Sequence, residues 1–426
     1  MADAPLLVLV LAAGKSTRMR SDTPKVLHKV AGVHLLRWVL EQAATLAPSK
    51  TLVIVGNGAE RVRKAAGDFP GVTFVTQEPQ QGTGHAVMQA RKHLEAFNGE
   101  VCVLCGDVPL IRAETLAALR DAHRAAGAAA TVLTTELHDP AGYGRIVRNE
   151  GGNVSAIVEQ RDLQRGQERI REVNSGTYFF DTAALLECLD RLKADNSQKE
   201  YYLTDAIRLL AESGRRVAAH LCADSREVLG INTRKDLAAC DVIARERVTE
   251  ALMLSGVTVL DPANTYIEAG VQIGRDTTVY PFTAVHAGVQ IGANCEIGPF
   301  AHLRAGTKIG NGCKVGAFVE TKNAVYGDGA KSGHLAYMGD VKLGRNVNIG
   351  AGSIVANYDG EKKHQTEIGD DAFIGCGTVL VAPVKVGKGA QTGANTVVPK
   401  GKDVPDNTVV VGAPARVLKA RSTKAT

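Results

Sequence analysis

Aromatic side chains are scarce in this chain: they make up 4% of its 426 residues, and Trp38 is the only tryptophan. The surplus of positive charge is also small, at +5. No basic run is interleaved with aromatic residues, which argues against a nucleic-acid-binding protein. A weak basic surplus is better suited to small anionic ligands.

Cysteine pairs and long apolar runs are also lacking. The eight cysteines are scattered, and the C-x-x-C of Cys102 and Cys105 lies in and just after an apolar strand. No second pair is near it, so reduced thiols of a cytoplasmic protein are a better interpretation than a zinc site. The apolar run of residues 6–13 follows an acidic Asp3 instead of a basic segment, so we do not expect a signal peptide, and no stretch is long enough to cross a membrane.

A six-residue repeat dominates the second half of the chain. Aliphatic residues recur at every sixth position without a break: Ile273, Val279, Val285, Ile291, Ile297, Leu303, Ile309 and Val315. Neither the helical period of 3.6 nor the strand period of 2 gives this spacing. It is the signature of a parallel β-helix, in which each aliphatic residue points into a narrow interior. The repeat resumes after residues 320–339 and 357–367, which we therefore predict to be loops projecting from a continuous prism.

The first half of the chain predicts a different architecture. Apolar strands at residues 6–11, 51–55, 72–75 and 101–104 alternate with helical stretches, as in a right-handed α/β sheet. A last strand is predicted at residues 228–231, followed by a helix over residues 234–254 that leads to the β-helix. Ligands of such sheets bind beyond the carboxyl ends of the strands.

The loop after the first strand carries Gly14, Lys15 and Ser16, but it is no P-loop, because Leu9 stands where that motif needs glycine. Its small residues still let backbone N–H groups approach a phosphate, which Lys15, Arg18 and Lys25 would neutralise. Asp107, at the end of another strand, is placed either to hold a metal ion or to cap the next turn.

These residues belong to a set of motifs. The set comprises residues 11–15 (LAAGK), 17–19 (TRM), 24–28 (PKVLH), 82–86 (GTGHA), 106–110 (GDVPL), 201–205 (YYLTD), 298–301 (GPFA), 333–335 (GHL), 339–340 (GD), 348–352 (NIGAG) and 357–360 (NYDG). In their number and order, the motifs resemble the bacterial N-acetylglucosamine-1-phosphate uridyltransferase/glucosamine-1-phosphate acetyltransferase family over nearly the whole chain. The resemblance implies an α/β Rossmann-like nucleotidyltransferase domain followed by a left-handed parallel β-helix of hexapeptide repeats.

For the first domain, the resemblance implies attack of N-acetylglucosamine-1-phosphate on the α-phosphate of UTP, giving UDP-N-acetylglucosamine and pyrophosphate. The protein would position the groups and neutralise charge. The uridine nucleotide would be held by Leu11, Ala12, Ala13, Gly14, Gln77, Gly82 and Thr83, the phosphates by Lys15, Arg18 and Lys25, and the amino sugar by Gly144, Glu159 and Asn174. Asp107 and Asn232 would ligate Mg²⁺.

For the β-helix, the resemblance implies transfer of an acetyl group from acetyl-CoA to the amine of glucosamine-1-phosphate. His334, in an interruption of the repeat, would be the general base. Arg304 and Lys322 would hold the sugar phosphate, Tyr337 and Asn348 the sugar, and Ala351, Asn357, Tyr358, Cys376 and Ala394 would line the CoA groove. The resemblance further implies a homotrimer that supplies cell-wall synthesis.

The expected boundaries are residues 1–232 for the uridyltransferase domain, 233–256 for a linker helix, 257–417 for the β-helix and 418–426 for a disordered basic tail. The chain departs from the family in three places. The β-helix is a coil or two shorter, Cys376 stands where serine is common, and the C-terminal end carries Gly-Ala-Pro-Ala-Arg, whose Arg416 would replace the family's contact with the CoA phosphate.

Two alternatives remain beside this interpretation. In one, a sugar nucleotidyltransferase uses its β-helix only to oligomerise, against which Arg304, Lys322 and His334 argue. In the other, the chain is a non-enzymatic regulatory subunit of the same two-domain plan, against which Lys15, Arg18, Lys25 and Asp107 argue.

Overall fold

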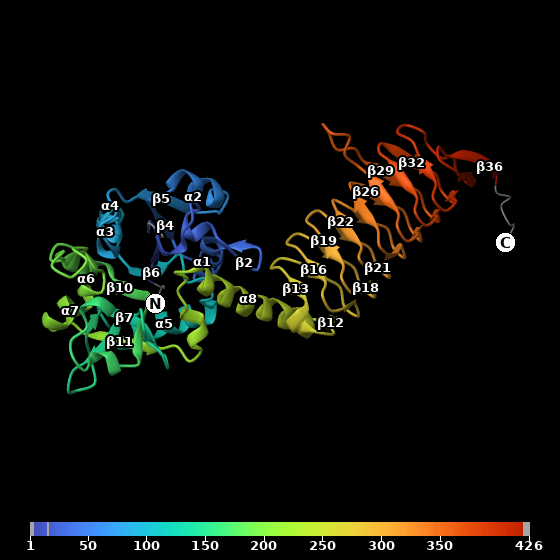
Figure 1. The fold of residues 1–426 in the computed structure, drawn as a ribbon. Helices are drawn as coiled ribbons and strands as arrows, with labels where there is room; N and C mark the ends of the chain where they lie inside the picture. The colour runs from blue at the N-terminus through green and yellow to red at the C-terminus, as the bar shows by residue number, and fades with distance from the viewer. Residues whose placement is uncertain (1–3, 15–16, 421–426) are drawn as a thin grey trace. The chain divides into compact units, whose positions relative to one another are not determined.

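The computed structural model of the protein describes residues 4–14 and 17–420. The chain divides into two compact units, Met1–Ile243 and Ala244–Thr426, each with its own core (Figure 1). Over the described residues, no helix combines the length and the apolar character needed to cross a membrane.

The first unit is built on a nine-stranded mixed sheet. Its main path runs β11 (Val217–Leu221), β7 (Ala130–Glu136), β10 (Glu172–Asp181), β6 (Glu100–Cys105), β1 (Leu6–Ala12), β4 (Lys50–Val55) and β5 (Val72–Thr76), with β8 (Arg145–Arg148) pairing β10 and β9 (Val154–Val158) pairing β8. Strands β6, β1, β4 and β5 are parallel, whereas β10 runs antiparallel to both β6 and β7. A small ribbon, β2 (Lys29–Val30) with β3 (Val33–His34), lies apart from this sheet.

Helices cover both faces of this sheet because β1 is apolar on both sides. Leu7 and Leu9 pack in the core of one face, and Leu6, Val8 and Val10 pack in the core of the other. The first face is covered by α3 (Thr83–Met88), α4 (Arg91–Glu95), α6 (Thr182–Leu189) and α7 (Asp205–Glu212), and the second by α1 (Leu35–Ala44), α2 (Ala59–Ala66) and α5 (Ala113–Ala126). The continuous apolar run of the first strand is thus the middle of a three-layer α/β/α fold.

The last strand of this unit was predicted in the wrong place. Residues 228–231 are not a strand: a 3₁₀ turn, η5 (Ser225–Val228), precedes an irregular stretch that reaches Asn232. The edge strand is β11, whose half-buried side chains give only a weak apolar pattern. The predicted helix over residues 234–254 is confirmed as α8 (Arg234–Leu254), and the division between the two units falls within it.

The second unit is a parallel β-helix with three sheets. The β12 sheet contains β12 (Thr258–Val259), β15 (Thr278–Val279), β18 (Glu296–Ile297), β21 (Lys314–Ala317), β24 (Lys331–His334), β27 (Asn348–Ile349), β30 (Phe373–Ile374), β33 (Gln391–Thr392) and β35 (Thr408–Val411). The β13 sheet contains β13 (Tyr266–Ile267), β16 (Ala284–Val285), β19 (His302–Leu303), β22 (Glu320–Lys322), β25 (Tyr337–Gly339), β28 (Ile354–Ala356), β31 (Val379–Val381) and β34 (Val397–Val398). The β14 sheet contains β14 (Gln272–Ile273), β17 (Gln290–Ile291), β20 (Lys308–Ile309), β23 (Val325–Tyr326), β26 (Val341–Leu343), β29 (Thr366–Ile368) and β32 (Val384–Val386).

The aliphatic residues of the six-residue repeat form one continuous interior, as predicted. Val279, Val285, Ile297, Leu303 and Val315 are fully buried, and Val279 pairs in register with Ile297, Val285 with Leu303 and Ile297 with Val315. The parallel β-helix that the repeat predicted is thus confirmed, and it is the left-handed form that the resemblance implied.

The predicted loop at residues 320–339 is wrong, because β22, β23, β24 and β25 continue the prism there. The repeat fails to show it because the inward residues include Thr321, Tyr326 and Ser332, and because paired residues are 17 rather than 18 positions apart (Lys314 with Lys331). The polar interior groups bond one another: Tyr326 Oη lies 3.0 Å from Ser332 Oγ. The second predicted loop is confirmed over residues 357–365, before β29 begins.

Residues 418–420 of the expected disordered tail are part of a strand, and residues 421–426 lie outside the described residues. Residues up to 420 belong to β36 (Arg416–Ala420), which pairs antiparallel with β35 at the end of the β12 sheet. An open sheet edge presents unpaired N–H and C=O groups, and a returning strand satisfies them.

Candidate active sites

A cavity of about 490 Å³ opens at the carboxyl ends of β1 and β6 in the first unit. It brings together many of the residues predicted from the sequence: Leu11, Ala12, Ala13, Gly14, Arg18, Lys25, Gln77, Gly82, Thr83, Asp107 and Asn232. Lys15 lies outside the described residues. This is the position at which ligands bind in open α/β sheets.

The side-chain oxygens of Asp107 and Asn232 both contact the ammonium group of Lys25 in this cavity. The ammonium of Lys25 forms an ion pair with Asp107 Oδ2 and donates a 3.0 Å hydrogen bond to Asn232 Oδ1. Arg18 donates to the same Asn232 oxygen at 2.8 Å. Asp107 and Asn232 come together because the backbone N–H of Ile231 donates to the carbonyl of Asp107 at 3.0 Å.

This pair fits Mg²⁺ by its chemistry. A carboxylate and an amide oxygen already share one cationic group, and Mg²⁺ in proteins takes one or two such ligands and completes its shell with water and phosphate oxygens. Over the part of the chain that the structure describes, no cluster of three or more His, Cys, Asp and Glu side chains is suited to a metal ion. A two-ligand site is therefore the one to test.

Gln77 organises the wall of the cavity beside α3. Its buried side-chain amide donates to the carbonyl of Gly82 at 2.9 Å. Gly82 has φ +102° and ψ 175°, and a Cβ at this position would lie 2.6 Å from the carbonyl oxygen of Tyr201. Thr83 Oγ1 accepts from the backbone N–H of Leu203 at 3.0 Å. The GTGHA and YYLTD motifs therefore lie side by side, with glycine where the two segments are closest.

The predicted sugar-binding residues adjoin one another but do not line the cavity itself. The backbone N–H of Asn174 donates to the carbonyl of Gly144 at 2.9 Å, and a Cβ on Gly144 would lie 3.6 Å from Glu159 Oε2. Burial raises the pKa of Glu159, whose Oε1 accepts from the hydroxyl of Thr204 at 3.1 Å. The link to the cavity is Cys105, whose thiol donates to the carbonyl of Gly176 at 3.4 Å.

Sequence reasoning missed two polar residues of the cavity wall, Gln198 and Glu200. Gln198 and Glu200 come just before the YYLTD motif, whose pairing with residues 81–84 carries them to the cavity. The only sign of Gln198 and Glu200 in the sequence is that they come directly before the YYLTD motif.

In the second unit, His334 belongs to a column at one corner of the prism. It follows Ala317 in register, at the end of β24, and the next coils place Ala351, Cys376 and Ala394 at the equivalent corner position. His334 and Cys376 are exposed. The catalytic candidate and three residues of the predicted CoA groove are therefore consecutive members of one column, although 17, 25 and 18 residues separate them in the sequence.

The residue after each column member sets the shape of this corner. In the coils before that of His334, this position is occupied by Phe282, Phe300 and Phe318. These side chains are exposed and stacked, with ring centroids 5.0 and 5.2 Å apart. After Leu335 the corresponding positions are Gly352 and Gly377. All these residues have positive φ, but only the two glycines have no side chain that projects from the corner. The corner is therefore bulky up to Leu335 and low in the next two coils, beside Ala351 and Cys376.

Three cations, Arg304, Lys322 and Lys363, gather on and near the β13 sheet. The pKa of Lys322 is lowered, mainly because the ammonium of Lys363 lies against it, and Arg304 adds to the effect. Arg304 also donates to Glu320 Oε1 at 2.8 Å. Adjacent ammonium groups repel each other, and an anion between them relieves that repulsion, as expected for a phosphate site. Lys363 was missed from the sequence, because nothing in the loop of residues 357–365 indicates that it folds back onto Lys322.

The loop of residues 357–365 is held in a fixed shape. Asn357 donates to Asp340, and Asp359 Oδ2 accepts from His364 Nε2 at 2.6 Å and from Lys400 Nζ at 3.1 Å. Backbone donors, led by the N–H of Lys362, lower the pKa of Asp359. Tyr337 is half-buried and pairs in register with Glu320, and Tyr358 is exposed in the loop. Asn348 lies in the β12 sheet, where it pairs with Lys331 and Phe373. Arg416, at the start of β36, is exposed.

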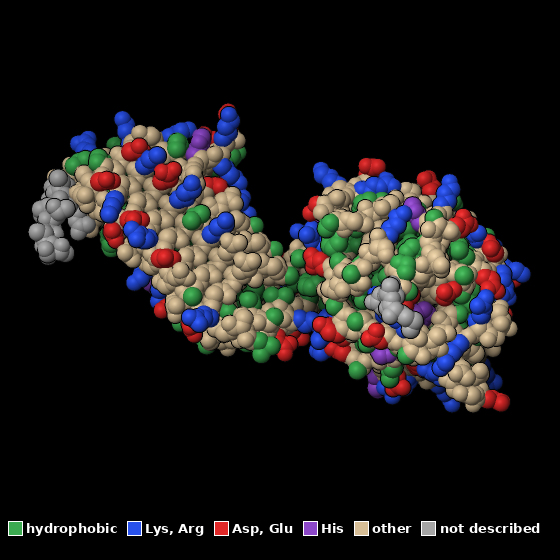
Figure 2. Space-filling model, turned by 180° about the vertical axis from the view of Figure 1, so that it is seen from behind, with side chains coloured by type: hydrophobic (Ala, Val, Ile, Leu, Met, Phe, Trp, Pro, Cys, Tyr) green, Lys and Arg blue, Asp and Glu red, His purple; other side chains and the backbone are tan. Residues whose placement is uncertain are grey.

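On the face drawn in Figure 2, cationic and anionic side chains are interspersed over both units. Neither sign forms an extended field on that face, in keeping with the small net charge of +5. The local cation groups at the two sites are therefore the informative electrostatic features.

Comparisons with known proteins match both units. Residues 8–202 match the MobA-like NTP transferase domain, and residues 288–323 and 365–400 match the bacterial transferase hexapeptide (six repeats). Proteins named "Bifunctional protein GlmU" match from Geobacillus sp. (strain WCH70), 43% identical over 444 positions and 96% of each chain, and from Geobacter metallireducens, 42% identical over 465 positions and 97% of each chain. That of Pelotomaculum thermopropionicum is 46% identical over 413 positions, covering 89% of this chain and 90% of the relative.

Proposed function

The chain belongs to the family of the bifunctional GlmU proteins, and from that premise we propose which of its residues carry each of its two reactions. It is a bifunctional enzyme of UDP-N-acetylglucosamine synthesis: it acetylates glucosamine-1-phosphate with acetyl-CoA and transfers a uridylyl group from UTP to N-acetylglucosamine-1-phosphate. The proposal rests on one observation: residues far apart in the sequence gather into one cavity and one corner column.

For uridylyl transfer, the cavity at β1 and β6 holds the nucleotide and the adjoining Gly144, Glu159 and Asn174 hold the sugar. Asp107 and Asn232 would hold Mg²⁺, which when bound neutralises charge on the triphosphate. Lys25 and Arg18, which contact these two oxygens, then turn to the phosphates. The sugar phosphate oxygen attacks the α-phosphorus, and pyrophosphate leaves; the residues supply position and positive charge.

For acetyl transfer, Arg304, Lys322 and Lys363 bind the phosphate of glucosamine-1-phosphate, and the sugar is oriented by Tyr337 and Asn348. His334 accepts a proton from the 2-amino group as its nitrogen attacks the thioester carbonyl. The C–N bond forms, the C–S bond breaks, and the CoA thiolate leaves along the corner of Ala351, Cys376 and Ala394. Asn357, Tyr358 and Arg416 complete the CoA contacts.

We further propose a cytoplasmic homotrimer formed through the β-helix. Stacked Phe282, Phe300 and Phe318, with exposed Leu335, form an apolar ridge along one corner, which supports association because a monomer would leave it in water. The domain boundaries at residues 232, 256 and 417 belong to the same proposal. Two alignments run over more positions than the 426 residues of this chain, which supports the loss of residues, such as β-helix coils, that its relatives keep.

The experiment that tests the proposal measures both half-reactions in two variants. Asp107→Ala should abolish Mg²⁺-dependent pyrophosphate release and leave acetyl transfer nearly intact. His334→Ala should lower the kcat of acetyl transfer by roughly a hundredfold to ten-thousandfold and leave uridylyl transfer unchanged. Loss of both activities in a folded Asp107→Ala protein would refute independent sites. Near-normal acetyl transfer by His334→Ala between about pH 6 and pH 9 would refute the general base.

A further inference from the structure

A buried carboxylate lies outside the nucleotide cavity and has no part in the reaction as described so far. Glu227, in η5, is only 5% exposed, and it does not line the cavity. Burying a carboxylate is costly unless charged or polar donors surround it. Its partners therefore indicate what the position is for.

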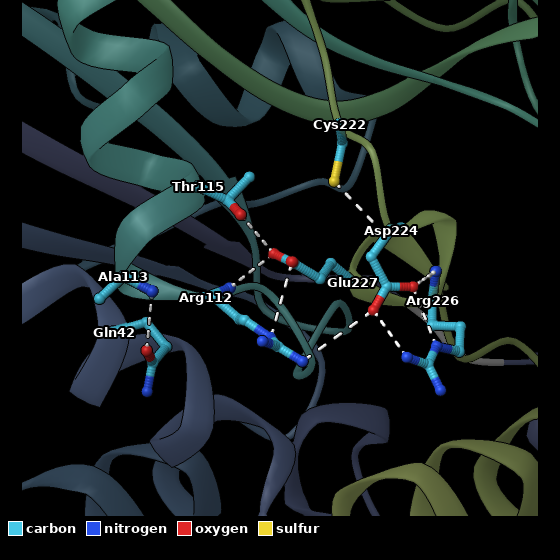
Figure 3. Close-up of polar contacts among 8 residues, drawn as sticks. All are labelled: Gln42, Arg112, Ala113, Thr115, Cys222, Asp224, Arg226 and Glu227. Carbon is cyan, nitrogen blue, oxygen red and sulfur yellow. Dashed lines mark hydrogen bonds and ion pairs between the residues drawn. The ribbon is translucent and has the colours of Figure 1, made fainter. Parts of the chain in front are cut away.

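All the contacts of Glu227 drawn in Figure 3 go to the start of α5. Its Oε2 accepts from the backbone N–H of Arg112 at 3.1 Å and from the hydroxyl of Thr115 at 2.6 Å. Its Oε1 lies 3.6 Å from Arg112 Nε. Arg112 is the N-cap of α5, and its own side chain makes no capping bond. Glu227 thus supplies, from 112 to 115 residues away, the acceptor that the helix start lacks.

The two segments joined by Glu227 are the ones that carry the proposed metal ligands. Asp107 precedes Arg112 by five residues, and Asn232 follows Glu227 by five residues. Between them, the N–H of Ile231 donates to the carbonyl of Asp107. The segments therefore run antiparallel, fastened at one end by Glu227 and at the other by the backbone beside Asp107.

We propose that Glu227 is a positioning residue for uridylyl transfer, which sets the spacing between the carboxylate of Asp107 and the amide oxygen of Asn232. This inference rests on the proposed function, because it takes these two residues to be the metal ligands. Glu227 acts on the metal through the two segments and touches neither substrate nor metal.

The charge and both oxygens of Glu227 are needed for this role. A glutamine at position 227 offers one acceptor oxygen, and its NH₂ group meets the donors of Arg112, so at least one of the three contacts is lost. Loss of a residue that orients metal ligands typically weakens metal binding on the order of tenfold to a hundredfold.

Asp224 provides a matched control on the same turn. Its carboxylate accepts from the backbone and guanidinium of Arg226 and comes no closer than 4.0 Å to Arg112. Asparagine there keeps an oxygen for the backbone N–H of Arg226, so Asp224→Asn removes a nearby charge without detaching η5 from α5.

The test uses the full chain with UTP and no sugar phosphate, so that no turnover occurs. Mn²⁺ serves as the probe, and its binding is followed by the electron paramagnetic resonance of the free ion. Binding should be lost in Asp107→Ala, weakened about tenfold to a hundredfold in Glu227→Gln, and unchanged in Asp224→Asn. Thr115→Val should weaken Mn²⁺ binding as well, and Thr115→Ser, which keeps the hydroxyl, should restore it.

Each other outcome refutes a specific statement. Wild-type Mn²⁺ affinity in Asp107→Ala would overturn the metal assignment in the proposed function. Wild-type affinity in Glu227→Gln, with loss in Asp107→Ala, would overturn the role of Glu227 alone. If Glu227→Gln fails to fold, the Thr115 variants decide: equal affinity of Thr115→Val and Thr115→Ser for Mn²⁺ would overturn the inference.

Discussion

Gly82 is the position at which the smallest change should have the largest effect on uridylyl transfer. Its backbone, with φ +102° and ψ 175°, lies in a region that is essentially reserved for glycine. Placing alanine there costs of order 1–3 kcal/mol of strain. The new Cβ would also lie 2.6 Å from the Tyr201 carbonyl oxygen, so the segments must separate by about 0.8 Å to reach an ordinary contact of 3.4 Å.

That separation acts directly on the nucleotide cavity. Gly82 lines it, and the carbonyl of Gly82 accepts the hydrogen bond that fixes Gln77. A displacement of about 1 Å in positioning groups can cost about a hundredfold in rate, equivalent to roughly 2.7 kcal/mol of barrier. We therefore expect Gly82→Ala to lower kcat/KM for UTP about a hundredfold.

The assay is pyrophosphate release with UTP and N-acetylglucosamine-1-phosphate, and acetyl transfer in the same preparation reports on the other unit. Gly71→Ala is the matched control: its φ is +75°, no atom lies within 4 Å of its added Cβ, and it does not line the cavity. It should lose about 1–2 kcal/mol of stability and keep full activity. If Gly82→Ala turned over UTP like the wild type, the close approach of the two segments would not govern the cavity.

Two further predictions concern the β-helix. Lys363→Ala should raise the KM for glucosamine-1-phosphate several-fold, as Arg304→Ala and Lys322→Ala should, whereas Lys362→Ala should not; equal effects in both neighbouring lysines would exclude a specific contact. Because Lys363 lowers the pKa of Lys322, the charge of Lys322 is present at low pH and is lost as pH rises through that lowered pKa. Substrate affinity should fall on this alkaline side in the wild type, and Lys363→Ala should move that pH-dependent fall to higher pH, as measured by KM against pH. Light scattering at micromolar concentration should give the mass of a trimer; a monomer would contradict the proposed assembly.

The prism was predictable because its interior admits one residue per side, which imprints a six-residue period on the sequence. The period is hidden where polar residues point inward, with Thr321 bonding Thr307 and Tyr326 bonding Ser332, and where paired strands are 17 residues apart. In residues 320–339, the spacing of apolar residues therefore predicts loops although the coils continue. The strand β11 was missed for a related reason, because an edge strand is buried on one side only.

Residues of the cavity wall that lie within motifs were predictable one by one, but their partners were not. Asp107 and Lys25 each belong to a local motif, whereas their ion pair exists only because the fold brings two loops together. Lys363 and Glu227 carry no motif signal that the sequence analysis used, and their significance lies in contacts with residues that are 41 and 112 to 115 positions away. Such pairings depend on tertiary geometry, which no local pattern records.

The register of the β-helix also determines how this protein can change its length during evolution. Every strand of the prism pairs with the equivalent strand one coil away, so each coil depends on its neighbours alone. Deleting one whole coil lets the flanking strands pair as before, whereas deleting three or four residues would turn interior side chains outward. Length should therefore vary among relatives in steps of one turn of the prism, and turns can be lost before Gly298 without disturbing the coils that carry Arg304 and His334.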